Sequence, residues 1–590
     1  MKQGINLFRL SNSLWSGLLD SNPQLFRELQ GRLKTRNVII SAAISVIAQF
    51  ISVVFLLGKL PDLEQKFRQC SRYGTTLIYN QFDTGGQICY VRDDLGHWMV
   101  NWQLWWLDLF TILSFVSIAA LPIVGTYMLI ADMEREEHRG TLNFIRLTPQ
   151  SASSILLGKI LGVPILLYTA IALIFPLHLV AGLQAHIPLV WILAFDLAIA
   201  TCCAFFYSLA LLWSLFNIGV SGCKSWLASG LLGFVLLFST IILFTTHSTL
   251  DHFLAVILLF NPGTVIAYLI EASHLSFGTT YFLSIDDLAT LSFYGQSLWA
   301  NTITGFGFIL FNFCLWTYWC WSILKRRFQS PESNLISKVH SYYLTCCFVV
   351  IALGFTLQQD YLYENEFYDL ANKFSPFQRH INDNFICLQI SLSLFGLGLI
   401  YALTPHRQTL HDWARHRHQT SKNSSIWKEL VFDENSPAIV SIAIDLAIAI
   451  IFITPSMLFI LEPNQRFLFW GLIISTTNIL LCAAIVQFIL MSKTRSRGVW
   501  SLATIGSVII LPALGLGIAG ISIKSAPSLW LFSFIGASAT EYASGSATAF
   551  SIFVQWLAIS VIGIQMTKKL KQAGASETKV LMGRTNALID

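Results

Sequence analysis

Residues 38 to 57 read VIISAAISVIAQFISVVFLL and contain no charged side chain. A helix needs about 20 mostly apolar residues to cross the hydrocarbon core of a bilayer. The segment is therefore predicted to span a membrane once. The arm before residue 38 is polar and basic, and no small-residue cleavage site follows the apolar run. We therefore do not interpret the arm and this run as a cleaved signal peptide.

The whole chain repeats this character, since 54% of its 590 residues are hydrophobic and 12% are charged, against about 25% charged in soluble domains. Long apolar runs inside a bilayer must be helical unless they close a barrel, because every backbone polar group needs a partner there. We predict an all-α polytopic membrane protein with about 12 transmembrane helices. The predicted spans are residues 38–57, 107–130, 155–180, 187–216, 226–244, 298–324, 342–357, 385–403, 439–460, 467–491, 499–521 and 550–564.

A further apolar run, residues 253 to 270, is interrupted by Asn261, Pro262 and Gly263. We expect it to form a re-entrant or interfacial hairpin. If residues 253–270 are not counted as a span and the N-terminus is cytoplasmic, 28 of the 37 Lys and Arg residues lie on the cytoplasmic side. This distribution agrees with the positive-inside rule. Both termini are therefore predicted to be cytoplasmic. Membrane topology accounts for the net charge of +5, and no nucleic-acid partner is expected.

The predicted spans fall into two halves with the same order of features. Each half has a long first outside loop, a charged inside loop after its second span and a basic end. We expect two parallel six-helix repeats related by an axis along the membrane normal. The alternative is that any twelve-span protein can be divided into similar halves without being a repeat. The predicted domains are a cytoplasmic arm with an amphipathic helix (residues 1–36), a first six-span half (residues 37–338) and a second six-span half with a cytoplasmic tail (residues 339–590).

The inside loop of the first half, residues 134 to 159, reads EREEHRGTLNFIRLTPQSASSILLGK. Its acidic start is expected to extend the second span into the cytosol, and Gly140 to end that helix. A short amphipathic turn then places Leu142, Ile145 and, with less weight, Phe144 on one side. Thr148 and Pro149 are expected to cap and begin the next helix. Such a turn suits either docking of a soluble subunit or simple contact with lipid headgroups.

This loop resembles that of ABC transporter permeases of the type-2 exporter family, which runs from acidic residues through R-G-T-L and T-P to G-K. Gly158 and Lys159 supply the G-K. The resemblance implies a coupling helix that docks on a nucleotide-binding subunit. The implied docking residues are Glu137, Arg139, Gly140, Thr141, Leu142, Ile145, Thr148 and Pro149.

Residues 22 to 37, NPQLFRELQGRLKTRN, are similar to the amphipathic elbow helix of the same family. The second half departs from the family pattern because its inside loop lacks R-G-T-L. It keeps a Ser-Pro pair and a short amphipathic stretch, IWKELVF. A weaker second docking site is therefore expected at Trp427, Leu430, Ser436 and Pro437.

No G-x-x-x-x-G-K-[ST] phosphate loop occurs in the sequence. The chain is accordingly expected to be a permease subunit without its own ATPase site, in the cell inner (plasma) membrane. ATP and Mg would be bound by partner ABC nucleotide-binding subunits, two per chain. The alternative is an ion-coupled secondary transporter, for which Asp196 and Asp445 are the candidate pathway residues; either acid can equally be a packing residue bonded to Ser, Thr or Tyr.

Cysteine spacing predicts no metal site. Cys70 and Cys89 share one hydrophilic outside loop, where an oxidising compartment would allow a disulfide. Two free thiols are the alternative.

Overall fold

The computed structural model describes residues 22–60, 72–78, 87–91, 97–216, 222–245, 253–274, 288, 291–357, 376–420, 425–461, 463–492 and 497–574. The chain divides into two compact units, the first up to residue 329 and the second from residue 330, apart from short exchanged segments near residues 251 and 292. Among the described residues, twelve helices are long and apolar enough to cross a membrane, six in each unit. The protein is therefore an all-α polytopic membrane protein, as predicted.

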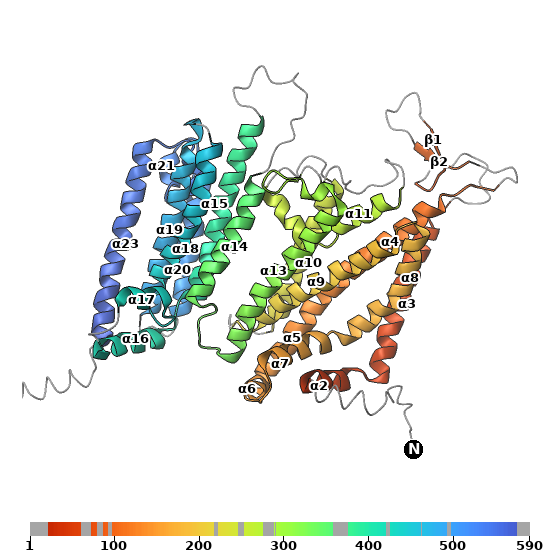
Figure 1. The fold of residues 1–590 in the computed structure, drawn as a ribbon, viewed down its shortest axis with the longest axis horizontal. Coiled ribbons are helices and arrows are strands. Elements are labelled where there is room, and N and C mark those ends of the chain that lie inside the picture. Colours follow the sequence, from red (N-terminus) through yellow and green to blue (C-terminus); the bar gives the residue numbers. More distant parts are fainter. Residues whose placement is uncertain are drawn as a thin grey trace, which may run out of the picture. The chain divides into compact units, whose positions relative to one another are not determined.

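The membrane-spanning helices of unit 1 form a bundle (Figure 1). The second of them runs without a break from Trp102 to His138 and extends well past the apolar run predicted at residues 107–130. The helices are α3 (Thr35–Leu57), α4 (Trp102–Ala119) continued by η1 (Ala120–Val124) and α5 (Gly125–His138), α8 (Ile165–Gln184), α9 (Leu189–Ser214), α10 (Lys224–Thr245) and α13 (Thr302–Gln329).

The stretch η1 is a π-helical turn that contains Pro122. Proline cannot donate the usual backbone hydrogen bond, so a helix that contains one must rearrange locally. The hydroxyl of Tyr207 on α9 donates to the carbonyl of Leu121 at 2.7 Å. Gly125 makes room for this tyrosine, since a Cβ there would lie 2.1 Å from its hydroxyl oxygen. The turn is thus built into the contact between this helix and α9.

Short elements lie at both ends of unit 1 (Figure 1). One end carries α2 (Pro23–Arg32), α6 (Thr141–Arg146) and α7 (Ala152–Gly162), and the other carries the antiparallel pair β1 (Thr76–Ile78) and β2 (Gln87–Cys89). Arg72 and the hydroxyl of Tyr73 both donate to Asp108 of α4, at 2.7 and 2.8 Å. Burial and this carboxylate raise the pKa of Tyr73, so its hydroxyl remains a donor.

Cys89 is disulfide-bonded in the structure. Cys70, the other cysteine of the predicted pair, lies outside the described residues. The nine remaining cysteines are free thiols.

The prediction of one uninterrupted span over residues 155–180 is wrong. α7 ends at Gly162 and α8 begins at Ile165, with Pro164 between them. Val163 is still helical, but Pro164 has φ of −85° and ψ of 15° and has no backbone N–H to donate, so the helix breaks at Pro164.

The break predicted at Asn261, Pro262 and Gly263 is confirmed. It separates η2 (Phe253–Phe260) from α11 (Thr264–Ala272), and neither piece is long enough to be a candidate span. The Asn261 side chain donates to the hydroxyls of Ser239 and Thr240 on α10, both at 2.9 Å. A short turn, η3 (Leu298–Ala300), precedes α13.

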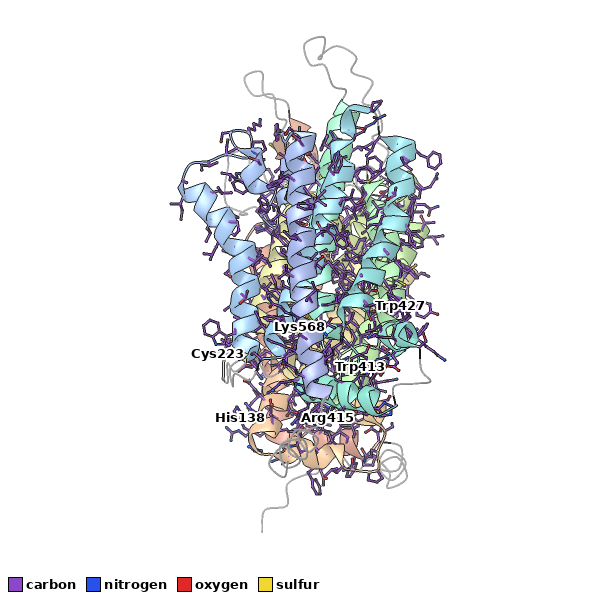
Figure 2. All side chains as sticks on the ribbon, turned by 90° about the vertical axis from the view of Figure 1, so that its left-hand side faces the viewer. His138, Cys223, Trp413, Arg415, Trp427 and Lys568 are labelled. Atoms are coloured by element: carbon purple, nitrogen blue, oxygen red, sulfur yellow. The ribbon has the colours of Figure 1, made fainter. Side chains whose placement is uncertain are left out.

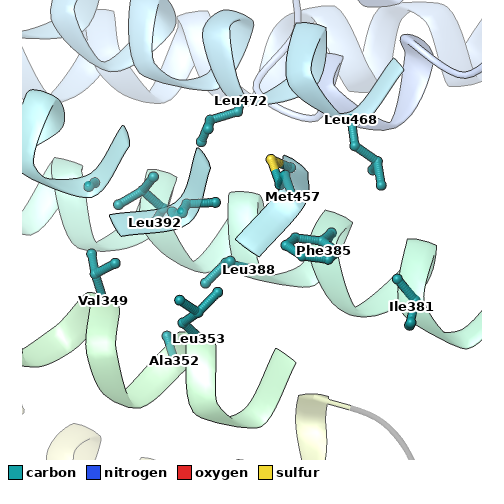
Figure 3. Close-up of a cluster of buried hydrophobic side chains, with 12 residues drawn as sticks. Val349, Ala352, Leu353, Ile381, Phe385, Leu388, Leu392, Met457, Leu468 and Leu472 are labelled. Carbon is teal, nitrogen blue, oxygen red and sulfur yellow. The ribbon is translucent and has the colours of Figure 1, made fainter. Parts of the chain in front are cut away.

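Unit 2 has its own apolar core, formed where α14 (Lys338–Thr356), α15 (Pro376–Leu403), α18 (Ile439–Ile460) and α19 (Phe467–Leu490) meet. Figure 3 shows Phe385 and Leu388 facing Leu353 and Met457 in this core. Two helices at one end of the unit, α16 and α17, are too short or too polar to be spans. The elements are α14 (Lys338–Thr356), α15 (Pro376–Leu403), α16 (Arg407–Thr420), α17 (Ile426–Phe432), α18 (Ile439–Ile460), η4 (Pro463–Gln465), α19 (Phe467–Leu490), α20 (Arg497–Ile518), α21 (Pro527–Trp530), α22 (Gly536–Ala539) and α23 (Gly545–Gly574).

Candidate functional site

The loop singled out in the sequence forms a short helix, α6, beyond the end of α5. Gly140 joins the two helices with φ of 70°, a left-handed conformation that glycine adopts at little cost. The helical extension of the second span to His138 and its end at Gly140 are therefore confirmed. Glu137, Arg139 and Thr141 are all exposed around this turn.

The two faces of α6 differ from the expected arrangement. Leu142 and Ile145 do share one side, but both are 5% exposed and pack inward. The exposed apolar residues are Phe144 and Leu147, at 74% and 84%. The face open to a partner is therefore formed by Phe144 and Leu147. The expected placement of Phe144 beside Leu142 and Ile145 is wrong, and neither Phe144 nor Leu147 is among the implied docking residues.

The predicted helix cap at Thr148 and Pro149 is wrong. α7 begins only at Ala152, and the side chain of Ser151 accepts from the backbone N–H of Ser154. The hydroxyl of Thr148 instead donates back to the carbonyl of Ile145 at 2.7 Å. Thr148 therefore closes α6, and Pro149 lies exposed in the turn that follows.

A buried lysine lies at the centre of this end of unit 1. The ammonium group of Lys159 on α7 is 2.7 Å from Asp132 and 2.8 Å from Glu136, both on α5, and 3.7 Å from Glu28 on α2. Its side chain has no exposed area. Burying a charge is costly unless it is paired, and here one lysine binds carboxylates from two other helices.

Two arginines of α2 complete the cluster. Arg32 binds Glu28 and Asp132, and Arg27 binds Glu28 and Glu136. The three carboxylates lie within 4.8 Å of one another, near enough for a shared metal ion, but three cations already bind their oxygens. The cluster is therefore charge-balanced, and it ties the elbow helix to the loop that carries α6.

Close backbone packing reinforces this tie. A Cβ at Gly158 would lie 2.8 Å from the backbone nitrogen of Leu25, and one at Gly162 would lie 2.5 Å from Cβ of Glu28. The side chain of Asn22 caps α2 and also donates to the carbonyl of Ser154 at 2.8 Å. The amphipathic helix predicted at residues 22–37 is present at Pro23–Arg32. Its two buried side chains, Gln24 and Glu28, are polar.

Further contacts join α6 to the last turn of α13. The guanidinium carbon of Arg146 lies 5.5 Å from the ring centre of Phe328, a cation–π distance. Burial lowers the pKa of Arg146, Glu137 opposes this shift, and Arg327 adds to it. The carboxylate of Glu134 accepts from the backbone N–H of Gly222 at 3.0 Å. α6 is thus held by several neighbouring segments of unit 1.

The corresponding loop of unit 2 also carries a short helix, α17. Trp427 is 69% exposed, and Figure 2 shows it near the same end of the unit as Trp413, Arg415 and Lys568. Leu430 is half-buried, and Ser436 and Pro437 are buried. Of the four predicted docking residues, Trp427 is therefore the one fully open to a partner.

Ser436 behaves like Thr148, because its hydroxyl donates back to the carbonyls of Glu429 and Asp433. α18 begins at Ile439 without a side-chain cap, so Ser436 and Pro437 do not cap it. In both loops the residue before proline closes the preceding short helix.

A buried lysine also holds the unit 2 loop. The ammonium group of Lys338, at the start of α14, donates to the hydroxyl of Ser436, to the carbonyl of Leu430 at 2.8 Å and to that of Pro437 at 3.2 Å. In unit 1, Glu28 before the first span binds Lys159 in the loop after the second span. In unit 2, Lys338, the first residue of the first span, binds the loop after the second span. Each unit therefore anchors this loop to the start of its first span or to the helix just before it.

The two intramembrane acids have different surroundings. Asp445 is fully buried and accepts hydrogen bonds from Ser341 at 3.0 Å and Thr345 at 2.9 Å, both on α14. Asp196 lines a cavity of about 960 Å³ in unit 1. One of its carboxylate oxygens is buried and has no hydrogen-bond partner in the structure as described. Asp445 thus joins two helices, whereas Asp196 faces open space.

Comparison with known protein families, curated proteins and solved structures finds no match to this chain. The geometry of the two loops is therefore the basis of the functional argument.

Proposed function

We propose that this chain is the permease subunit of an ABC exporter of the type-2 family, placed in the cell inner membrane. Separate nucleotide-binding subunits would dock on α6 and, less strongly, on α17, and would supply the ATP and Mg chemistry. The observation that carries this proposal is the exposed pair Phe144 and Leu147 on a helix that is otherwise firmly anchored.

The position of α6 favours a protein partner over lipid. α5 continues from Glu134 to His138, about 6 Å of charged helix, before the chain turns into α6. Helices that lie on a membrane surface usually present Lys and Arg toward anionic lipid, whereas the one basic residue of α6, Arg146, packs on Phe328. An apolar pair on such a helix suits a soluble partner better than a headgroup layer.

The anchoring of α6 suggests how force would reach the spans. Lys159 ties the loop to α2 and α5, and Arg146 contacts the last turn of α13. A push on α6 would therefore be transmitted to several helices at once rather than absorbed by a flexible loop. This is the property that a coupling element requires.

Purification of the tagged full-length chain from its native membrane tests the proposal. We expect an ATPase with a Walker phosphate loop to co-purify, and the double variant Phe144→Glu, Leu147→Glu to lose it. The control Phe144→Leu, Leu147→Met keeps both positions apolar and should retain the ATPase. Retention of the ATPase by the glutamate variant would refute docking at α6.

The alternative is an ion-coupled secondary transporter, and Asp196 is the residue that favours it. Asp445 contributes little to that alternative because Ser341 and Thr345 already satisfy it. Transport by inside-out vesicles that requires an ion gradient but not ATP, and that Asp196→Asn abolishes, would establish the alternative.

A further inference from the structure

The cavity beside Asp196 has the size of a small-molecule site. Its volume of about 960 Å³ lies near the upper end of the range of about 300–1,000 Å³ typical of such sites. Its walls come mainly from α7, α8, α9 and α13, and along α9 they extend from Leu193 to Ser208. Fifteen helical residues correspond to about 22 Å, so the cavity is long and narrow.

The polar groups of the walls are mostly satisfied within the protein. Aliphatic and aromatic side chains form most of the surface, and the hydroxyls among them, other than that of Ser153, donate to nearby backbone carbonyls. These pairs are Ser117 to Leu113, Tyr168 to Ile160, Tyr207 to Leu121, Ser208 to Ala204 and Thr317 to Phe313.

Asp196 differs, because its buried carboxylate oxygen has no hydrogen-bond partner among the described residues. Leaving a carboxylate oxygen unpaired in an apolar wall is costly. The free energy is recovered if a ligand brings the missing donor.

The other charged residue of the walls, Lys325, lies too far away to serve as that donor. It is four residues from the end of α13 that contacts α6, and it lies 5.8 Å from the ring centre of Trp321. Asp196 lies seven residues, or about 10 Å, after the first residue of α9, Leu189. This end of α9 lies beside the start of α4, because Gln103 donates to the carbonyl of Ala185 just before α9. The two charges therefore lie near opposite ends of the cavity.

We propose that this cavity binds an elongated cationic amphiphile, with its apolar body along α8, α9 and α13 and its amine on the carboxylate of Asp196. An inorganic cation fits less well, because hard cations need six or more oxygen ligands and the walls around Asp196 are mostly aliphatic and aromatic. The assignment of this amphiphile as a transported molecule rests on the proposed function. Its binding does not depend on an ATPase.

The cavity is also connected to the docking end of the unit. α7 contributes Ser153 and Leu157 to the walls, and α13 contributes Thr317 and Trp321. These are the helices that Lys159 and Phe328 join to the α6 loop. Displacement of α6 would therefore change the shape of the binding cavity.

Saturable binding of tritiated dodecylamine to the full-length chain in phosphatidylcholine nanodiscs tests the inference, with dodecanol and dodecanoate as competitors of equal chain length. We expect the amine to bind at least about tenfold more tightly than either competitor, since charge-assisted hydrogen bonds are the stronger kind. Asp196→Asn should lose about tenfold or more in amine affinity, and Asp196→Glu should retain binding. Ala204→Trp, which fills the cavity without touching the acid, should abolish it.

The matched control is Glu332→Gln, the same acid-to-amide change at an exposed position, which should bind like the parent chain. Equal competition by all three probes, absence of saturable binding, or undiminished amine binding by Asp196→Asn would each overturn the inference. If the chain binds the amine but captures no ATPase, the binding site is confirmed and the proposed ABC permease function is refuted.

Discussion

Replacing Lys159 with methionine should destabilise unit 1 by removing the charge that holds three helices together. The ammonium group lies 2.7 Å from Asp132 and 2.8 Å from Glu136. At an effective dielectric constant of about 20, each contact supplies on the order of 6 kcal/mol of attraction. Desolvation offsets much of this gain, and breaking a buried pair by removing one partner costs about 3–5 kcal/mol net.

Thermal unfolding of the purified chain at a fixed scan rate measures this loss. At about 2.1 cal/mol/K of unfolding entropy per residue, the 590-residue chain loses about 0.8 °C of Tm per kcal/mol, so Lys159→Met should lower the Tm by about 2.5–4 °C. Lys568→Met is the control, since Lys568 is exposed and surface changes stay within about 0.5 kcal/mol.

A double-mutant cycle isolates the ion pair from other effects of the substitution. Lys159→Met combined with Glu136→Gln should lose less stability than the sum of the single changes, by about 0.5–3 kcal/mol. A Tm for Lys159→Met within about 0.5 °C of the parent value, the size of a surface effect, would refute the role given to the cluster.

The remaining predictions concern packing and covalent links. Gly158→Ala should cost about 1–3 kcal/mol of stability, because the added Cβ would lie 2.8 Å from the backbone of Leu25. The control Gly230→Ala, with no atom within 4 Å of its added Cβ, should be neutral or stabilising in the same Tm measurement. Equal effects of the two substitutions would contradict the packing argument. Asp445→Asn should cost about 1–3 kcal/mol because one of its two hydroxyl donors loses its acceptor, yet leave transport intact; loss of transport at unchanged Tm would make it a pathway residue. Cys89→Ser should cost about 2–4 kcal/mol and should be insensitive to reductant, whereas the parent chain should lose the same stability on reduction.

The fold class was predictable because membrane insertion depends on long apolar runs, and each run can be recognised from its own local sequence. α3, α9 and α19 all lie close to their predicted bounds. The failure at residues 155–180 came from giving hydropathy priority over Pro164. That proline interrupts an apolar run without changing its hydrophobicity.

The candidate site was only partly predictable, because its geometry depends on contacts between distant segments. The break at Gly140 is local, and it was found. The inward side of α6 depends on what packs against Leu142 and Ile145, and the sequence of the loop does not contain that information. The spacing of Phe144 and Leu147, three residues apart, was a usable signal for a second apolar face.

The buried charges were missed for the same reason. Glu28 and Asp132 are more than 100 positions apart in the sequence, and only the fold brings both to Lys159. Lys338 lies close to the end of a basic cluster and looked like an ordinary topology signal. Its burial against Ser436 is a property of the packed unit.

The central claim is that the exposed face of α6 contacts an ATPase. A photo-crosslinking amino acid in place of Phe144, activated in native membranes, tests it most directly, with the same probe at Trp427 as the comparison. The account predicts that the crosslinked chain at Phe144, identified by mass spectrometry, carries a Walker phosphate loop, and that Trp427 gives the same product in lower yield. Crosslinks from Phe144 to lipid alone, or to proteins without an ATPase motif, would contradict it.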